Sequence, residues 1–412
     1  MTAVLEFHFL SRWLTHRLRP RLVFFRRPVS AYQVWGITGL LFAIALAAAL
    51  SLRRGLELPI VGILLAGALA TFFALVMATK IATGRETIVY YQHEIAILAQ
   101  AALLARLLGR PVLPYLDISA IAVGCFLAFG RIGCLMVGCC HGRPARTGIL
   151  YGQSYVEAGF LPDFTGVPLL PVQAIESAWV FLIVLVDSVW VARGSRPGEA
   201  FASYVAGYAV GRFFLEYGRG DPQRPYWKGS SAAQWISFAS VALVTRAEFA
   251  GSLPFHYWHA SVAAATAVLI LWNACRDTDA RRLFHARHIA EIARALSRVS
   301  AFDPYARSIP VARTSFGICI SHGMLRAAAG VSHHYTFSRQ CPSLTLEQAR
   351  DFAKLTRGLR GHSQPCLVSR GVTGAWHIVF ASAAPDGRPM ERKAADMADT
   401  EGSPLIQAPP VR

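Results

Sequence analysis

One stretch of the chain, residues 130–143, combines side chains that could bind an anion with others that could bind a metal or react as nucleophiles. It follows an apolar run directly and contains Gly130, Arg131, Gly133, Cys134, Cys139, Cys140 and His141. An ionisable residue at membrane depth is costly and is most often functional. We therefore treat Arg131 as a candidate anion-binding group.

A second polar group lies at helical spacing within residues 199–217. Tyr208, Arg212 and Glu216 are each four residues apart, and Arg219 follows three residues later, so a helix would carry them in one stripe. A buried ion pair of Arg212 with Glu216 that only fixes packing is one interpretation. An anion site is the other, because a guanidinium group binds phosphate through two parallel hydrogen bonds.

The arginines of the two groups gain significance together. If Arg131, Arg212 and Arg219 converge at one end of a helix bundle, they would neutralise a phosphodiester at a site open to lipid. This combination predicts a phospholipid substrate.

Three further polar residues could serve the same site. His93 lies in a mostly apolar segment and is either a hydrogen-bonded structural residue or a base for a thiol or hydroxyl nucleophile at neutral pH. Gln173 and Glu176 follow Pro171 at the start of another apolar segment. They could orient a bound headgroup or cap their helix.

The thiols Cys134, Cys139 and Cys140, with His141, leave several interpretations open. Zinc ligands usually come as two separated pairs, and the second pair is missing, so no metal is expected. A disulfide is possible if the segment is extracytoplasmic. A reactive thiol of low pKa beside Arg131 or His141 is the third interpretation.

Composition indicates where these residues must be placed. Of 412 residues, 54% are hydrophobic and 16% charged, and the mean hydropathy is +0.39, which is typical of a polytopic membrane protein. The net charge of +17 suits anionic lipid headgroups. The basic residues do not form a compact domain with base-stacking aromatics, so no nucleic-acid partner is expected.

Apolar runs long enough to span a bilayer, about 20 residues each, predict five transmembrane helices, at residues 34–52, 59–78, 114–129, 172–191 and 256–272. Residues 87–108 and 199–217 contain charged groups, which must face protein or a cavity. Residues 232–244 form a shorter run that could be half of a broken span. We expect an all-α polytopic membrane protein with seven or eight transmembrane helices and a small C-terminal α+β soluble appendage.

Basic residues in short loops predict the orientation. Arginines at 53, 54, 106, 110, 193 and 196 fall on one side if the helices alternate, and this side should be cytoplasmic. The loop after Arg131 and the end of the helix that carries Arg212 are then extracytoplasmic. The basic residues before position 30 argue for the opposite orientation.

Four domains are expected: a basic N-terminal segment (1–30), a transmembrane domain (31–275), the appendage (276–384) and a disordered tail (385–412). In the appendage, residues 281–298 read as an amphipathic helix. Residues 314–321 and 376–382 read as strands, and Thr345 with Gln348 makes a capping-box pair before a helix over 346–359.

The chain resembles the prolipoprotein diacylglyceryl transferase family, as a divergent member with a Cys-rich motif and a C-terminal extension. Over about residues 30–275 the resemblance is carried, in order, by His93, Gly130-Arg131-x-Gly133, Pro171-x-Gln173-x-x-Glu176 and Tyr208-x-x-x-Arg212-x-x-x-Glu216-x-x-Arg219. It implies an enzyme of the bacterial inner membrane that moves the diacylglyceryl group of phosphatidylglycerol onto the lipobox cysteine in the signal peptide of a lipoprotein precursor, without a cofactor.

By this resemblance, Arg131 and Arg212 would hold the phosphate and His93 would be the base for the substrate thiol. Glu216 and Arg219 would complete the polar cluster. The residues expected to bind substrate are Gly130, Gly133, Gln173, Glu176, Tyr208, Glu216 and Arg219. The alternative is a noncatalytic membrane protein that keeps the fold and binds lipid, or binds metal or thiols through its Cys-rich loop.

Overall fold

The computed structural model describes residues 15–24, 26–84, 90–301, 309–327 and 330–381. By its internal contacts the chain divides into two units, residues 1–289 and 290–412. The sequence placed the end of the transmembrane domain at residue 275, and the functional limits of the domains stay a prediction.

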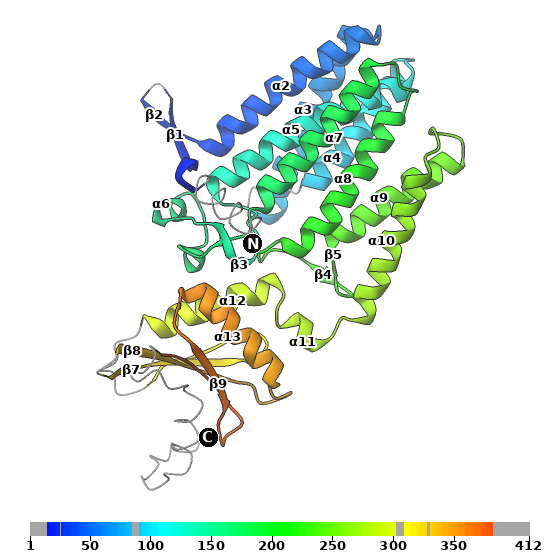
Figure 1. Ribbon diagram of the computed structural model, residues 1–412. Coiled ribbons are helices and arrows are strands. Elements are labelled where there is room, and N and C mark those ends of the chain that lie inside the picture. The colour runs from blue at the N-terminus through cyan, green and yellow to red at the C-terminus, as the bar shows by residue number, and fades with distance from the viewer. Residues whose placement is uncertain (1–14, 25, 85–89, 302–308, 328–329, 382–412) are drawn as a thin grey trace. The chain divides into compact units, whose positions relative to one another are not determined.

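The first unit is a bundle of long helices, and α5, α7 and α8 run side by side in it (Figure 1). Its long helices are α2 (Ala31–Arg53), α3 (Leu58–Thr83), α4 (Tyr90–Leu107), α5 (Val112–Val137), α7 (Val172–Ala192), α8 (Glu199–Gly218), α9 (Ala232–Phe249) and α10 (Tyr257–Cys275). Among the described residues, α2, α3, α5, α7 and α10 are long and apolar enough to cross a membrane. The predicted all-α membrane fold with a C-terminal sheet-containing region is confirmed, and α9 is one continuous helix.

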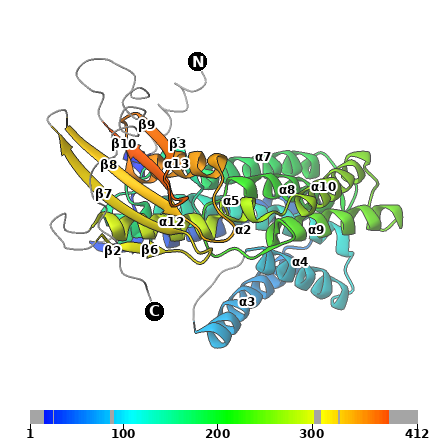
Figure 2. The ribbon, with the colours of Figure 1, turned by 90° about the horizontal axis from the view of Figure 1, so that it is seen from below.

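The outer helices keep apolar side chains on the surface. Leu41 of α2 is 62% exposed and Phe73 of α3 is 65% exposed. Other large apolar side chains along these helices are exposed too. Exposed apolar surface of this kind marks contact with a membrane or with another protein, and in helices of this length it suits lipid. Figure 2 shows α3 and α4 as a neighbouring pair of helices.

Helix α5 extends further than the sequence predicted. The apolar run ends at Phe129, but the helix continues through Arg131 to Val137 and ends where Gly138 adopts a left-handed conformation, with φ of 80°. The predicted segment, residues 114–129, is therefore shorter than the helix, because Arg131 pairs with Glu176 of α7 and can remain in a buried helix.

Two close contacts fix α8 against its neighbours. Gly211 lies against Trp179 of α7, where a Cβ atom would come within 2.2 Å of the indole ring. At its start, the backbone N–H groups of Gly198 and Phe201 donate to the buried carboxylate of Asp117 on α5, both at 2.8 Å. A carboxylate at a helix N-terminus accepts hydrogen bonds from backbone N–H groups that have no partner within the helix. It also interacts favourably with the helix dipole. These contacts set the position of Arg212 along the bundle.

The basic loops predicted to share one membrane side do lie at one end of this unit. The Arg54 guanidinium donates to the backbone carbonyl of Ser195 at 2.7 Å, and Arg110 pairs with Glu57 at 2.6 Å. Which side of the membrane this end occupies stays a prediction.

At the opposite end, the segment after α5 folds over the bundle. It contains β3 (Pro144–Ile149), α6 (Gln153–Val156) and the 3-10 helix η1 (Pro162–Phe164), and a short hairpin, β4 (Tyr226–Trp227) with β5 (Ser230–Ser231), precedes α9. The predicted N-terminal segment holds the hairpin β1 (Arg21–Phe24) and β2 (Arg27–Ser30), while residues 1–14 lie outside the described part of the chain.

After α11 (Asp279–Arg282), the amphipathic helix predicted at 281–298 is found as α12 (Ala286–Ser300) and leads into the second unit. That unit is an antiparallel sheet in the order β6 (Val311–Arg313), β7 (Cys319–Ala327), β8 (Gly330–Ser338), β10 (Trp376–Phe380), β9 (Cys366–Arg370), with α13 (Leu346–Arg360). Phe352 of α13 stacks on Phe337 of β8 at 5.2 Å. The predicted capping box of Thr345 and Gln348 is confirmed.

The C-terminal unit differs from the prediction in its strands. The strand expected at 314–321 is wrong in its first half, because residues 314–318 form a turn closed by Thr314 and Ile318. Strands β8 and β9 were not predicted. The tail expected at 385–412 lies outside the described residues.

Candidate active site

Glu176 of α7 is the centre of a buried charge network. Its side chain is fully buried, and its Oε2 atom lies 3.0 Å from Nε of Arg131 and 3.3 Å from Nη1 of Arg219. Its Oε1 atom lies 4.0 Å from Nη1 of Arg212 and accepts a hydrogen bond from the Tyr208 hydroxyl at 3.1 Å. The structure thus brings together five residues that the sequence predicted for one site, from α5, α7 and the region of α8.

Two further carboxylates extend this network. Glu216 pairs with Nη2 of Arg212 at 2.9 Å and with Nη1 of Arg224 at 2.5 Å. Asp221 accepts from Nε of Arg219 at 2.9 Å and from Nε of Arg224 at 2.8 Å. Although burial raises the pKa of Asp221, these two guanidinium groups hold it below its usual value.

Asp221 and Arg224 were missed by the sequence reasoning. They lie in the irregular segment after α8, where helical spacing gives no signal. Their only sequence signal is a separation of three residues, which also allows an ion pair within a short turn.

The network carries an excess of positive charge. Four guanidinium groups, from Arg131, Arg212, Arg219 and Arg224, face the three carboxylates of Glu176, Glu216 and Asp221. In addition, Nη1 of Arg212 is buried and has no hydrogen-bond acceptor. A buried donor without an acceptor is costly. One bound anion would supply the missing acceptor and balance the charge.

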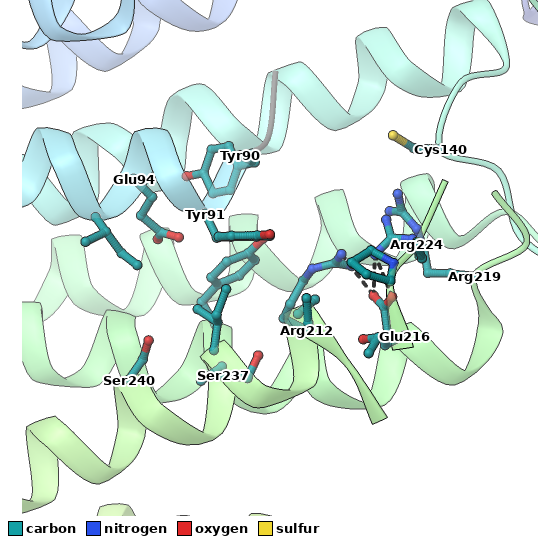
Figure 3. Close-up of a pocket in the computed structure, with 18 of the residues that line it drawn as sticks. Tyr90, Tyr91, Glu94, Cys140, Arg212, Glu216, Arg219, Arg224, Ser237 and Ser240 are labelled. Carbon is teal, nitrogen blue, oxygen red and sulfur yellow. Dashed lines mark hydrogen bonds and ion pairs between the residues drawn. The ribbon is translucent and has the colours of Figure 1, made fainter. Parts of the chain in front are cut away.

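A cavity of about 430 Å³ adjoins these arginines. Helices α4, α8 and α9 contribute most of its wall, and Figure 3 shows Arg212, Glu216, Arg219 and Arg224 at one end, with Glu94 and Ser240 further along. Apolar side chains line it as well, namely Ile95, Leu98, Val205, Ala209 and Ile236. A charged end and apolar walls suit a ligand with an anionic head and an apolar body.

His93, the predicted base, is not among the residues that line this cavity. It is buried on α4, and its ring lies 5.0 Å from that of Phe72 on α3. The neighbouring Glu94 does line the cavity, together with Tyr90 and Tyr91. Of the described residues, no histidine contributes to the wall.

The predicted glycines have different surroundings. A Cβ atom on Gly133 would meet Tyr32 of α2 at 3.2 Å, whereas Gly130 has open space around it. Gln173 binds the loop after α5, because its side-chain amide donates to the backbone carbonyl of Cys139 at 2.8 Å. The predicted substrate-binding residues Gly133 and Gln173 thus have packing contacts in this structure.

Backbone pairing brings the Cys-rich loop beside Arg219. Gly142 forms an isolated bridge with Arg219, and the N–H of Gly220 donates to the carbonyl of His141 at 2.9 Å. A Cβ atom on Gly220 would come within 2.2 Å of the Gly142 carbonyl oxygen, so only glycine allows this approach.

The three predicted thiols lie together, while His141 turns away from them. The sulfur atoms of Cys134, Cys139 and Cys140 are all within 4.8 Å of one another. The His141 ring packs near Phe160 and Phe164, and its Nδ1 lies 2.9 Å from the Gly142 carbonyl. Burial lowers the pKa of His141.

Comparison with known proteins adds independent findings. Residues 22–247 match the family described as prolipoprotein diacylglyceryl transferase. A phosphatidylglycerol–prolipoprotein diacylglyceryl transferase of Clostridium tetani is 33% identical over 132 residues, which cover 32% of this chain and 51% of the relative.

Two other similar proteins carry the same name. One, from Clostridium perfringens, is 36% identical over 95 residues, covering 23% of this chain and 36% of the relative. Another, from Methylibium petroleiphilum, is 30% identical over 152 residues, covering 36% of this chain and 55% of the relative. The chain thus spans between about a third and about half the length of these relatives.

Proposed function

Because the chain belongs to the prolipoprotein diacylglyceryl transferase family, we propose that it is a phosphatidylglycerol–prolipoprotein diacylglyceryl transferase of the bacterial inner membrane. It moves the diacylglyceryl group of phosphatidylglycerol onto the thiol of a lipobox cysteine. The acceptor is the signal peptide of a lipoprotein precursor.

The observation that carries this proposal is the arginine cluster at one end of a cavity with apolar walls. Nη1 of Arg212 lacks an acceptor, and Arg131 and Arg219 share one oxygen of Glu176. A phosphodiester headgroup would accept from these donors, while the start of its acyl chains would lie along the apolar side chains.

The arginine cluster would stabilise the transition state of this reaction. The acceptor thiolate attacks the carbon of the diacylglyceryl group that is bonded to the phosphate oxygen. The bond between this carbon and the oxygen breaks, and its electron pair stays on the oxygen. Glycerol phosphate leaves as a phosphomonoester, so the negative charge near the phosphate rises by one. Guanidinium groups already oriented toward that charge stabilise the transition state more than the ground state.

The proposed roles follow from these contacts. Arg131 and Arg212 bind the phosphate, with Arg219 beside them, and Tyr208, Glu176 and Glu216 hold the guanidinium groups in place. A substrate-binding role for Gly130, Gly133 and Gln173 stays a prediction. A role for His93 as the base for the thiol stays a prediction, because His93 is not among the residues that line the cavity and its ring packs near Phe72.

Mass spectrometry of a lipobox peptide tests the proposal. The peptide is incubated with purified full-length protein and phosphatidylglycerol in detergent, and a diacylglyceryl adduct on the cysteine is expected. A peptide whose cysteine is replaced by serine is the control. An unmodified peptide, with phosphatidylglycerol still bound to the protein, would contradict transfer and favour the noncatalytic lipid-binding alternative.

A further inference from the structure

The three thiols at the end of α5 form a compact donor set. Cys134 is buried in the last turn of α5, Cys140 is half-buried, and Cys139 is exposed, yet their sulfur atoms all lie within 4.8 Å of one another. Zinc–sulfur bonds of about 2.3 Å in a tetrahedron separate neighbouring sulfurs by about 3.8 Å. Small side-chain rotations would therefore bring all three sulfurs within bonding distance of one ion.

The backbone holds this arrangement in an unfavourable conformation. Cys140 has a positive φ of 56°, which is uncommon for a residue other than glycine, asparagine or aspartate. Gly138, two residues earlier, is also left-handed, and Gln173 binds the carbonyl of Cys139 between them. Such strain persists where the surrounding structure requires it, and it is concentrated at functional sites.

Positive charge lies close to this donor set, because the guanidinium groups of Arg131 and Arg219 are near enough to Cys140 to act on it electrostatically. Three thiolates with one divalent cation carry a net charge of minus one, and these guanidinium groups would attract that charge. Cys140 also lines the cavity beside Arg219 (Figure 3), so an ion held by these thiols would lie close to the phosphate-binding arginines.

We propose that Cys134, Cys139 and Cys140 bind one zinc-class divalent ion whose open fourth position takes the acceptor thiol. Three protein ligands with one open position are the arrangement of catalytic rather than structural zinc sites. This inference rests on the proposed function. It supplies thiol activation at a cavity that no histidine lines in the described part of the chain.

The acceptor thiol would bind the ion in exchange for a bound hydroxide. The acceptor thiol displaces a hydroxide from the fourth position, its proton joins that hydroxide, and water leaves. A metal-bound thiol is deprotonated outright. The thiolate sulfur then donates an electron pair to the glycerol carbon while the C–O bond to phosphate breaks, as in the transfer described above.

Metal analysis of the purified full chain, prepared under reducing conditions, tests the site directly. One zinc per chain is expected in the wild type and in Cys275→Ser, an exposed cysteine at the end of α10 that serves as the matched control. Cys139→Ser and Cys140→Ser should lose the metal. Cys139 is exposed, so its serine variant removes a ligand with little effect on packing.

Cobalt substitution tests the fourth position independently of turnover. The cobalt protein should show thiolate-to-cobalt charge-transfer absorption, and addition of a lipobox peptide should shift the visible spectrum, while the cysteine-to-serine peptide should not. A metal-free reduced protein, a disulfide among the three cysteines, or a cobalt spectrum insensitive to the peptide would each overturn the inference.

Transfer activity separates this inference from the proposed function. Only a few per cent of a free thiol is ionised at neutral pH, so metal-free protein should transfer more than about tenfold slower than wild type and should regain rate as the pH rises toward about 8.5. Full activity without metal would overturn the inference and leave the transferase intact. Bound metal without any transfer would refute the transferase, and with it the role of the fourth position.

Discussion

Arg131 of α5 and Arg219, just beyond α8, both contact the same oxygen, Oε2 of Glu176, at 3.0 Å and 3.3 Å. A single carboxylate oxygen thus joins two guanidinium groups that are 88 residues apart in sequence. Two cations held this close repel each other unless negative charge lies between them. Glu176 supplies part of that charge, and we propose that the phosphate of the lipid supplies the rest.

Substitution of either phosphate-binding arginine should slow transfer by about 100-fold or more. Arg131→Ala and Arg212→Ala remove donors to the developing charge, and loss of one such donor slows a reaction by about 100-fold to 1,000-fold. Glycerol phosphate release from phosphatidylglycerol measures the rate. Arg106→Ala, an exposed arginine on α4, is the control and should retain activity. Wild-type rates in both variants would exclude the arginine cluster from catalysis.

Removal of the charge at Glu176 should destabilise the membrane unit. Glu176→Gln leaves Arg131, Arg212 and Arg219 facing one another in a buried site, and breaking a buried ion pair costs about 3–5 kcal/mol. Thermal unfolding in detergent should show a clearly lower Tm. Glu57→Gln breaks an exposed pair with Arg110, worth at most about 1 kcal/mol, and is the matched control. Equal Tm values for the two variants would contradict the central position of Glu176.

The predicted base can be tested against the thiol cluster. Because the His93 ring packs on Phe72 and does not line the cavity, we expect His93→Gln to keep the transfer rate within about tenfold of wild type, since a true general base contributes about 100-fold or more. The rate is measured with a lipobox peptide at neutral pH. A loss beyond 100-fold at an unchanged metal content would restore His93 as the base.

The second unit should lose stability in acid. Burial lowers the pKa of His322 and of His362 to about 4, and it also lowers the pKa values of His333 and His334. The charge of Arg360 adds to the shift of all but His334. The unfolded chain binds protons near pH 6.5, before the folded unit does, so stability is complete above about 6.5 and falls as the pH drops toward 4.

Hydrogen exchange of strands β7 and β8 in the full-length protein, corrected for intrinsic rates, measures this effect. Protection should be the same at pH 7 and pH 8 and should decrease progressively below pH 6.5. Equal protection at pH 4.5 and pH 7 would show that these histidines do not couple protonation to folding.

The sequence predicted the chemistry of the site better than its boundaries. The four-residue spacing of Tyr208, Arg212 and Glu216 placed them on one helix face. Tyr208 and Arg212 contact Glu176 from that face, and Glu216 pairs with Arg212. Asp221 and Arg224 were missed because they lie in irregular structure, where no period relates position to direction. The surrounding loops are joined by backbone pairing between distant segments, such as Gly142 with Arg219, and no local sequence pattern reports such pairing.

Two differences in the fold have physical reasons. The hydrophobic run of α5 ends at Phe129, but a buried ion pair lets the helix continue past Arg131, and no local pattern reports a partner on another helix. In the second unit, β8 does alternate, with Tyr335 and Phe337 buried, but its histidines and serines obscured the apolar pattern. Propensity thus identified the strands richest in apolar residues only.

We propose that the arginine cluster binds the phosphate of a lipid and that the diacylglyceryl group of this lipid then alkylates the acceptor thiol. Quantitative mass spectrometry of both products from one reaction tests it most directly, with wild-type protein, phosphatidylglycerol and a lipobox peptide. A diacylglyceryl thioether on the cysteine and glycerol phosphate are expected in equal amounts. An acyl thioester on the peptide, or glycerol phosphate without any thioether, would contradict it.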